Sequence, residues 1–209
     1  MRWLIYVAVA GPSLVLAGIG LSHPQELTAD TARWWTNMHI ILIPVFPLLA
    51  VAQWLLLRGT PAGLPGVLAW GARIAGWIYL GFYGALDTLA GIGTGWLVQN
   101  GVHSGGGHHG MAMDRDPVLN RLFEIGNDLG YVGAYAFVAA SLLTSAVLVM
   151  RAGPKAIAGG VVLVAGSVAF SQWHIYWPRG VASQLAIAIG FALLAWSLDG
   201  VRRAVPAAG

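Results

Sequence analysis

Histidines and carboxylates are the side chains that could do chemistry in this chain, and few of them interrupt its apolar sequence. Three histidines stand singly at the ends of apolar runs, namely His23, His39 and His174. Imidazole suits zinc, copper and iron, and a ligating ring usually gives its second nitrogen to a carboxylate, carbonyl or water. We therefore predict that these histidines bind a transition metal, copper or zinc, with nearby acids as further ligands or hydrogen-bond partners.

One acid, Asp87, stands inside the apolar run 70–98. An ionisable residue inside a membrane segment is costly and is by default a candidate functional residue. Tyr79, Tyr83 and Asp87 recur every four residues, so a helix places all three on one face. Neighbouring glycines such as Gly91 would let another helix approach closely. We expect Asp87 to form the floor of a polar pocket; the alternative is a neutral acid hydrogen-bonded to a neighbouring helix.

Two further acids begin the fourth apolar segment. Asp116–Pro117 predicts a helix start, with the aspartate as N-cap and the proline as first helical residue. Glu124, Asp128, Tyr131 and Tyr135 then follow at spacings of four, three and four, which puts two carboxylates and two phenols on one face. We predict catalytic roles for Asp87, Glu124 and Asp128. The alternative for this face is a stripe wetted at the membrane surface, where tyrosine is common.

The segment 99–116 is rich in glycine and holds a second group of possible metal ligands. These are His103, His108, His109, Met111 and Met113. Histidine and thioether together suit copper, and methionine favours Cu(I). The segment could therefore bind copper and deliver it to the protein. The alternative is weak, unselective binding of divalent metals, as expected for a His-rich tract.

Composition assigns the chain to membrane proteins. It is 57% hydrophobic and only 9% charged, whereas a soluble domain carries about 25% charged residues. The chain therefore cannot cover a water-facing surface, so we expect the lipid bilayer to surround it. Cysteine is absent, which excludes disulfides, thiolate ligands and cysteine nucleophiles. Nothing in the charge distribution indicates a nucleic-acid partner.

Six apolar runs are long enough to cross a bilayer, which takes about 20 residues. They are residues 3–21, 39–57, 70–98, 129–150, 157–176 and 181–198. No alternation with the period of a strand is present, so we predict an all-α, multi-pass protein of the cell membrane. Its 209 residues would form one domain of six helices in one bundle, with the His/Gly-rich segment 99–116 as the long outer loop between the third and fourth helices. We expect the first run to be an uncleaved helix rather than a signal peptide.

Lysine and arginine set the predicted orientation. With the N-terminus inside, the inner side holds Arg2, Arg58, Arg73, Arg151, Lys155, Arg202 and Arg203, and the outer side holds Arg33, Arg115, Arg121 and Arg179. Seven against four favours both termini in the cytoplasm. All the histidines then gather on the outer side. His39 lies 19 residues from Arg58, and His174 lies 19 from Lys155, so both are roughly 28 Å above the inner boundary at 1.5 Å per residue.

Metal binding is the first functional prediction. The site would serve metal handling, or it would activate a water against a lipid-soluble small molecule. An alternative is a haem b electron-transfer protein with His39 and His174 as axial ligands, because the two lie at matching depth on different helices. This alternative leaves Asp87, Glu124 and Asp128 unexplained.

Two alternatives need no metal. Asp87 could protonate an isoprenoid or other lipid substrate, with Glu124 or Asp128 as base. Asp87 could instead relay protons in a transporter, although the inner half of the predicted membrane region has few polar residues to continue a pathway. The sequence does not decide whether the protein is an enzyme.

Overall fold

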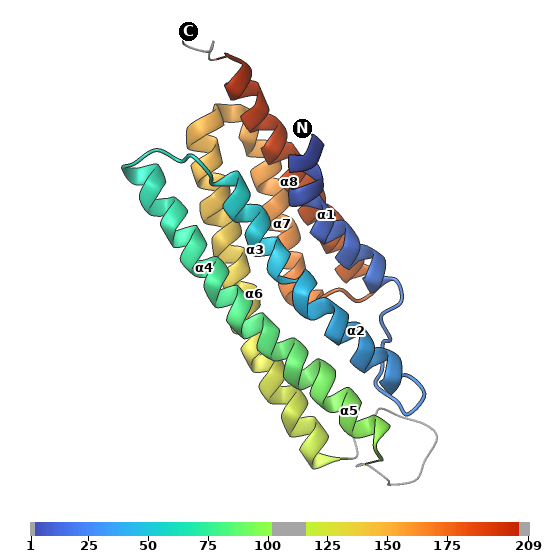
Figure 1. Ribbon diagram of the computed structural model, residues 1–209. Helices are drawn as coiled ribbons and strands as arrows, with labels where there is room; N and C mark the ends of the chain where they lie inside the picture. Colours follow the sequence, from blue (N-terminus) through green and yellow to red (C-terminus); the bar gives the residue numbers. More distant parts are fainter. Residues whose placement is uncertain (1–2, 102–115, 205–209) are drawn as a thin grey trace.

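Every regular element is a helix in the part of the chain that the structure describes, residues 3–101 and 116–204 of a computed structural model (Figure 1). Side chains are described as far as residue 199. The α-helices are Trp3–Gly20 (α1), Ala32–Val45 (α2), Pro47–Leu56 (α3), Leu64–Leu86 (α4), Thr94–Gln99 (α5), Pro117–Ala152 (α6), Ile157–Trp173 (α7) and Arg179–Ala204 (α8). A π-helix, Asp87–Gly93 (η1), joins α4 to α5, and a 3-10 turn, Gly153–Ala156 (η3), joins α6 to α7.

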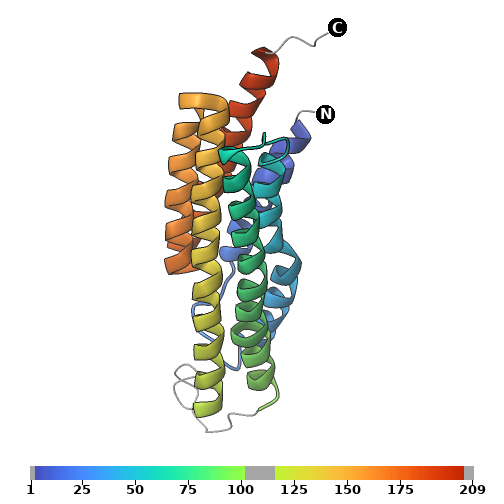
Figure 2. The same ribbon diagram turned by 90° about the vertical axis from the view of Figure 1, so that its left-hand side faces the viewer.

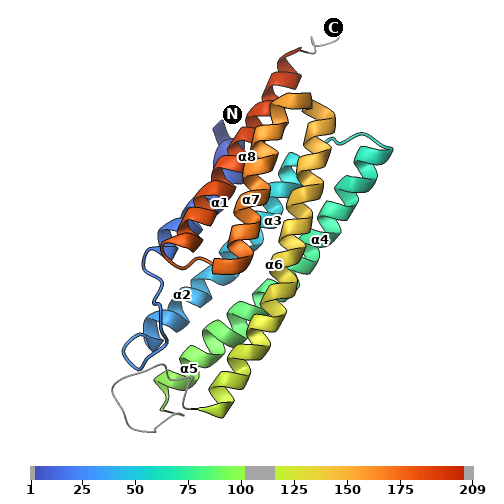
Figure 3. The same ribbon diagram turned by 180° about the vertical axis from the view of Figure 1, so that it is seen from behind.

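The helices form one elongated bundle. Helix α4 packs along α6, while α8 packs against both α1 and α7. Both chain ends lie at the same end of the bundle (Figure 1). Helix α6 continues well past the end of α7, as Figures 2 and 3 show. The end of the bundle away from the termini is therefore built by α2, η1, α5 and the first turns of α6.

Four helical segments are long and apolar enough to cross a membrane: Trp3–Gly20, Ala32–Leu56, Pro117–Trp173 and Arg179–Asp199. The helical prediction is thus confirmed, and apolar helices compatible with a membrane are present. The third segment includes the turn η3, so it contains two helices, α6 and α7. The α4–η1–α5 helix, which covers the predicted run 70–98, is not among the four. The number of spans and the orientation stay predictions.

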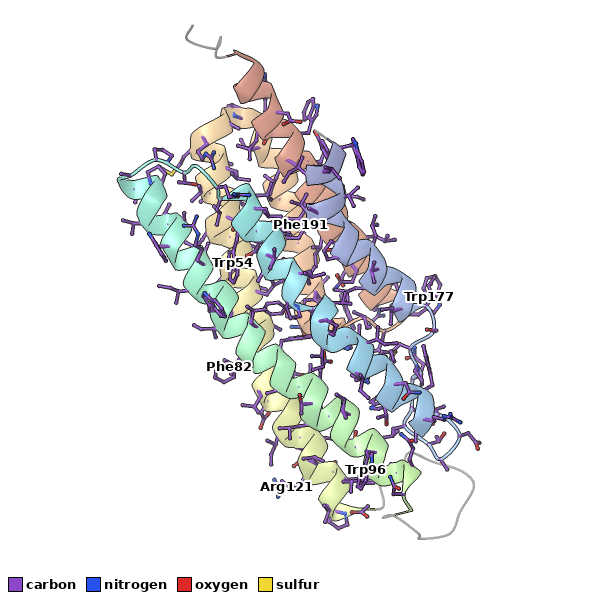
Figure 4. The ribbon with its side chains drawn as sticks, viewed as in Figure 1. Trp54, Phe82, Trp96, Arg121, Trp177 and Phe191 are labelled. Atoms are coloured by element: carbon purple, nitrogen blue, oxygen red, sulfur yellow. The ribbon has the colours of Figure 1, made fainter. Side chains whose placement is uncertain are left out.

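Many of the largest outward-facing side chains are apolar, as a lipid environment requires. Trp70 and Trp77 on α4 and Trp196 on α8 are each about 60% exposed or more. Phe191 is fully buried, and Figure 4 shows it in the half of the bundle nearer the termini. Trp96 and Arg121 mark the opposite end in the same view.

Helix α6 begins where the sequence predicts. The Asp116 carboxylate accepts hydrogen bonds from the backbone N–H groups of Val118 and Leu119, at 2.8 and 3.2 Å, and Pro117 is the first helical residue. These bonds satisfy amides that have no partner within the helix. The cap starts α6 twelve residues before the predicted run 129–150. The extra turns carry α6 beyond the end of α7.

Glycines let α2 and α6 approach the middle of the α4–η1–α5 helix. A Cβ on Gly91 would collide with the ring of His39, and a Cβ on Gly133 would lie 2.7 Å from the backbone nitrogen of Tyr83. Small residues at a helix interface allow this closeness. The packing interpretation of the glycines is confirmed at Gly91, whereas Gly84 faces open space.

The segment Asp87–Gly93 winds as a π-helix, which the sequence did not predict. An extra residue in one turn locally widens the helix, and such bulges are frequent at functional sites. This widened turn contains both Asp87 and the glycine that contacts His39. The helix is therefore widened where the ring of His39 packs against it.

Replacing Gly91 by alanine tests this packing. The added methyl group must displace the ring of His39, and such overpacking costs about 1–3 kcal/mol. We expect Gly91→Ala to lower the thermal unfolding temperature of the purified protein in detergent. Gly84→Ala is the matched control, because its methyl group meets nothing within 4 Å. Equal unfolding temperatures for the two variants would contradict the contact.

Candidate metal centre

Three histidines from distant parts of the chain meet at one place. His23 lies in the connection after α1, His39 is in α2, and His174 directly follows α7. One ring nitrogen from each lies within 4.8 Å of the other two. Three atoms 4.8 Å apart have their centre about 2.8 Å from each atom, the side divided by √3, and a Zn–N bond is about 2.0–2.1 Å. Shifts of under about 1 Å would therefore bring all three nitrogens onto one ion.

The connection that carries His23 is tied down on both sides. Trp34 Nε1 donates to the carbonyl oxygen of Ser22 at 2.9 Å, and Gln25 Nε2 donates to that of Trp177 at 3.3 Å. A Cβ on Gly20 would collide with the backbone of Ile175. Only glycine therefore lets the end of α1 come this close to the chain beside His174.

The backbone at His174 is unusual. Its φ is 46°, and among the residues that the structure describes it is the only non-glycine residue with a positive φ. Such a conformation is uncommon outside glycine and costs about 1–3 kcal/mol. It ends α7 and turns the chain sharply, which leaves the ring beside the other two histidines, 5.7 Å from His23 and 6.4 Å from His39 between centroids. Backbone strain retained at one position is often a sign of function.

Hydrogen bonds leave one nitrogen free on two of the rings. His39 Nδ1–H donates to the carbonyl oxygen of Trp35, and His23 Nδ1–H donates to that of Pro24, both at 2.7 Å. A carbonyl oxygen can only accept, so each Nδ1 carries the hydrogen and each Nε2 carries a lone pair. The Nε2 atom of His23 is buried and has no hydrogen-bond partner among the described residues. This arrangement matches the backbone partners that orient metal-binding histidines.

The third ring is held by a phenol. The hydroxyl of Tyr83 hydrogen-bonds Nδ1 of His174. A hydroxyl can accept from an Nδ1–H group, which again leaves Nε2 with its lone pair. Tyr83 comes from α4, so this bond links the long helix to the end of α7.

The cluster is buried among aromatic rings. His23 and His39 are 5% and 4% exposed. The ring of Tyr176 lies 4.1 Å from that of His23, and the ring of Trp35 lies 5.1 Å from that of His39. Burial lowers the pKa of His23 to about 3, so its ring is neutral at physiological pH. A neutral ring is the form that binds a metal.

The predicted acids lie outside this cluster. Within the described residues the group that could hold a metal contains the three histidines and no carboxylate. Asp87 is 1% exposed, and neither of its oxygens has a hydrogen-bond partner there. Glu124 is exposed and pairs with Arg121 at 3.0 Å, while Asp128 is exposed on the same helix. The structure thus brings together His23, His39 and His174 and does not bring Glu124 or Asp128 to them.

The second predicted group of ligands lies outside the described residues. It comprises His103, His108, His109, Met111 and Met113. Conversely, the sequence did not assign Tyr83, Trp35 or Tyr176 to the site. The four-residue spacing of Tyr79, Tyr83 and Asp87 did predict an inward face, and all three side chains are buried. The bond from Tyr83 to His174 depends on tertiary packing and left no local signal.

Comparisons with known proteins add no assignment: no family model, no curated protein and no solved structure matches this chain. The geometry of the three histidines and their surroundings is therefore the basis for inferring a function.

The contact between Tyr83 and His174 can be tested with a matched pair of variants. Tyr83→Phe removes the hydroxyl that orients His174, so we expect metal affinity to fall by about 10- to 100-fold. Tyr79→Phe is the control, because the Tyr79 hydroxyl donates instead to the carbonyl oxygen of Phe46 at 3.1 Å. The measurement is a competition titration of zinc against a chelator. Equal affinities in the two variants would show that Tyr83 does not support the site.

Proposed function

We propose that this chain is a multi-pass membrane protein that holds one transition-metal ion, zinc or copper, through His23, His39 and His174. The observation that carries the proposal is the meeting of three ring nitrogens within 4.8 Å of one another, two from the buried His23 and His39 and one from the half-buried His174. They come from segments separated by up to 151 residues. Burial of polar ring nitrogens is costly unless their lone pairs have partners. A bound metal ion supplies that partner.

The ligand set favours an ion with tetrahedral coordination. Three histidines and an open fourth position are the pattern of catalytic zinc sites, and imidazole also suits copper. The predicted catalytic acids are not part of the set. The fourth ligand would then be water, hydroxide or a bound substrate, and a metal lowers the pKa of its water to about 7. The site therefore suits metal-assisted chemistry on a small molecule as well as metal handling.

The same geometry is less suited to haem. Axial ligation by His39 and His174 requires a porphyrin plane between the two rings. His23 lies 5.5 Å from His39 and 5.7 Å from His174 between ring centroids. Its ring would occupy the space that the macrocycle needs. The space beside Gly91, which could have made room for the macrocycle, is filled by the ring of His39.

The proposal includes six spans with both termini in the cytoplasm. Helix α7 has 17 residues, or roughly 26 Å at 1.5 Å per residue, close to a bilayer core of about 30 Å. Helix α6 has 36 residues, or roughly 54 Å by the same rise. Its polar first turns, with Arg121 and Glu124 exposed, would project outside. The histidines would then lie at the outer boundary, where α7 ends.

A second candidate function uses Asp87. Its carboxyl group is buried, unpartnered among the described residues and placed at the start of the π-helix. Buried acids without partners call for a functional explanation. Acid catalysis on a lipid, or proton-coupled transport, would provide one. Asp87→Asn separates the two candidates, because it leaves the histidine ligands intact.

Metal content tests the central proposal. Each of His23→Gln, His39→Gln and His174→Gln should lose the tightly bound metal that the unaltered protein carries at one ion per chain. The reason is that two remaining ligands hold an ion far more weakly than three. The readout is elemental analysis after dialysis against a weak chelator. The paired change His108→Gln and His109→Gln is the control and should retain the ion. Retention in all three single variants would overturn the site.

The absence of cysteine makes the topology directly testable. A single cysteine placed at Asn100, after α5, should react with a membrane-impermeant maleimide in intact cells. One placed at Ala62, before α4, should react only after permeabilisation, because the proposed orientation puts it in the cytoplasm. Both positions are exposed. The reverse labelling pattern would refute the orientation, and labelling of both in intact cells would refute the number of crossings.

A further inference from the structure

A cavity of about 240 Å³ lies beside the histidine cluster. Two of the three histidines, His39 and His174, form part of its wall. An ion bound by the cluster would therefore be next to the cavity. A molecule in the cavity could then supply a fourth ligand to that ion.

The cavity runs from the core to the surface between α6 and the end of α7. Its inner wall includes Tyr83 and Phe170, which are 3% and 1% exposed. Its outer wall includes Tyr131 and Trp173, which are 52% and 40% exposed. These two residues lie on α6 and at the end of α7, which α6 continues past (Figure 2). Tyrosine and tryptophan are typical of the membrane–water interface, so in the proposed orientation the mouth would face the edge of the outer leaflet.

The inner walls suit a flat ring. Trp35, Tyr83, Phe123, Phe170 and Tyr176 surround the space, and aromatic pairs gain stability beyond the area that they bury. An apolar cavity of about 150 Å³ holds one benzene molecule, so about 240 Å³ has room for one substituted ring. Any long apolar tail must remain outside, in the lipid.

One polar side chain in the wall is free to bind a ligand. Asn127 is half-buried on α6, and its amide makes no hydrogen bond with the residues that the structure describes. An amide can both donate and accept. A ring oxygen near Asn127 and a second oxygen near the metal would fix the orientation of a bound molecule.

We propose that the cavity binds the ring of a tailed phenol or hydroquinone that enters sideways from the outer leaflet, with a phenolic oxygen on the metal. This inference rests on the proposed metal site and adds the class of its ligand. The aromatic walls select a ring over an alkyl head, and the metal selects an oxygen-bearing ring over a hydrocarbon. The mouth at the membrane edge selects a molecule with an apolar tail.

The test uses the full chain in lipid nanodiscs with Co²⁺ as the bound metal. Cobalt takes the same ligands as zinc, and its visible absorption changes when a new ligand binds. The probes are 4-hexylphenol, hexylbenzene and decanol. We expect 4-hexylphenol to change the spectrum and to saturate at one equivalent, whereas hexylbenzene and decanol leave it unchanged. A change with decanol as large as that with the phenol would overturn the aromatic class.

Two variants localise the binding. Asn127→Leu should weaken the apparent affinity for 2-hexylhydroquinone, whose second oxygen would reach the Asn127 amide, by about tenfold, as expected for one hydrogen bond, with cobalt content unchanged. Asn120→Leu is the matched control on the same helix, where the Asn120 amide bonds only exposed Glu124, and it should bind as the unaltered protein does. Equal affinities in both variants would remove Asn127 from the site.

The outcomes also separate this inference from the metal proposal. The unaltered protein could bind one cobalt ion, and His39→Gln could lose it, while 4-hexylphenol leaves the spectrum of the unaltered protein unchanged. That result would overturn the phenol site and leave the metal site standing. Failure to bind cobalt or zinc at all would overturn both.

Discussion

The structure depends on the meeting of three imidazoles at one point, those of the buried His23 and His39 and of the half-buried His174. Each ring is fixed by a partner that leaves a nitrogen available: the carbonyl oxygens of Pro24 and Trp35 for His23 and His39, and the hydroxyl of Tyr83 for His174. Buried polar atoms without partners are costly. The Nε2 atom of His23, which has no hydrogen-bond partner among the described residues, is therefore the strongest sign that a ligand belongs between the rings.

Close packing of the helices brings the three histidines together. Gly91 lets α2 come close enough for the ring of His39 to lie on the π-helix, and Gly20 lets the end of α1 reach the chain beside His174. The sharp turn at His174, with φ of 46°, ends α7 while α6 continues. His174, at the end of α7, belongs both to the histidine cluster and to the wall of the cavity. One local feature of the backbone thus places the proposed metal site beside the proposed binding cavity.

The sequence predicts much of this arrangement, because apolar runs and caps are local signals. The helices, the cap at Asp116 and the inward face of Tyr79, Tyr83 and Asp87 follow from spacing alone. Counting residues from the basic anchors also placed His39 and His174 at one level, where the structure brings them together. Helix rotation is not a local signal, so the spacing of Glu124 and Asp128 could not show that they face outward. The π-turn at Asp87 and the bond from Tyr83 to His174 likewise arise only when helices pack.

X-ray absorption at the metal edge of the purified, metal-loaded protein tests whether the three histidines hold the ion. We expect three imidazole nitrogens at about 2.0–2.1 Å and one further nitrogen or oxygen ligand in the fourth position. A sulfur scatterer would contradict it, because in a chain without cysteine only methionine could provide one. A shell of oxygen ligands without the imidazole signature would contradict it equally, since the metal would then lie away from His23, His39 and His174.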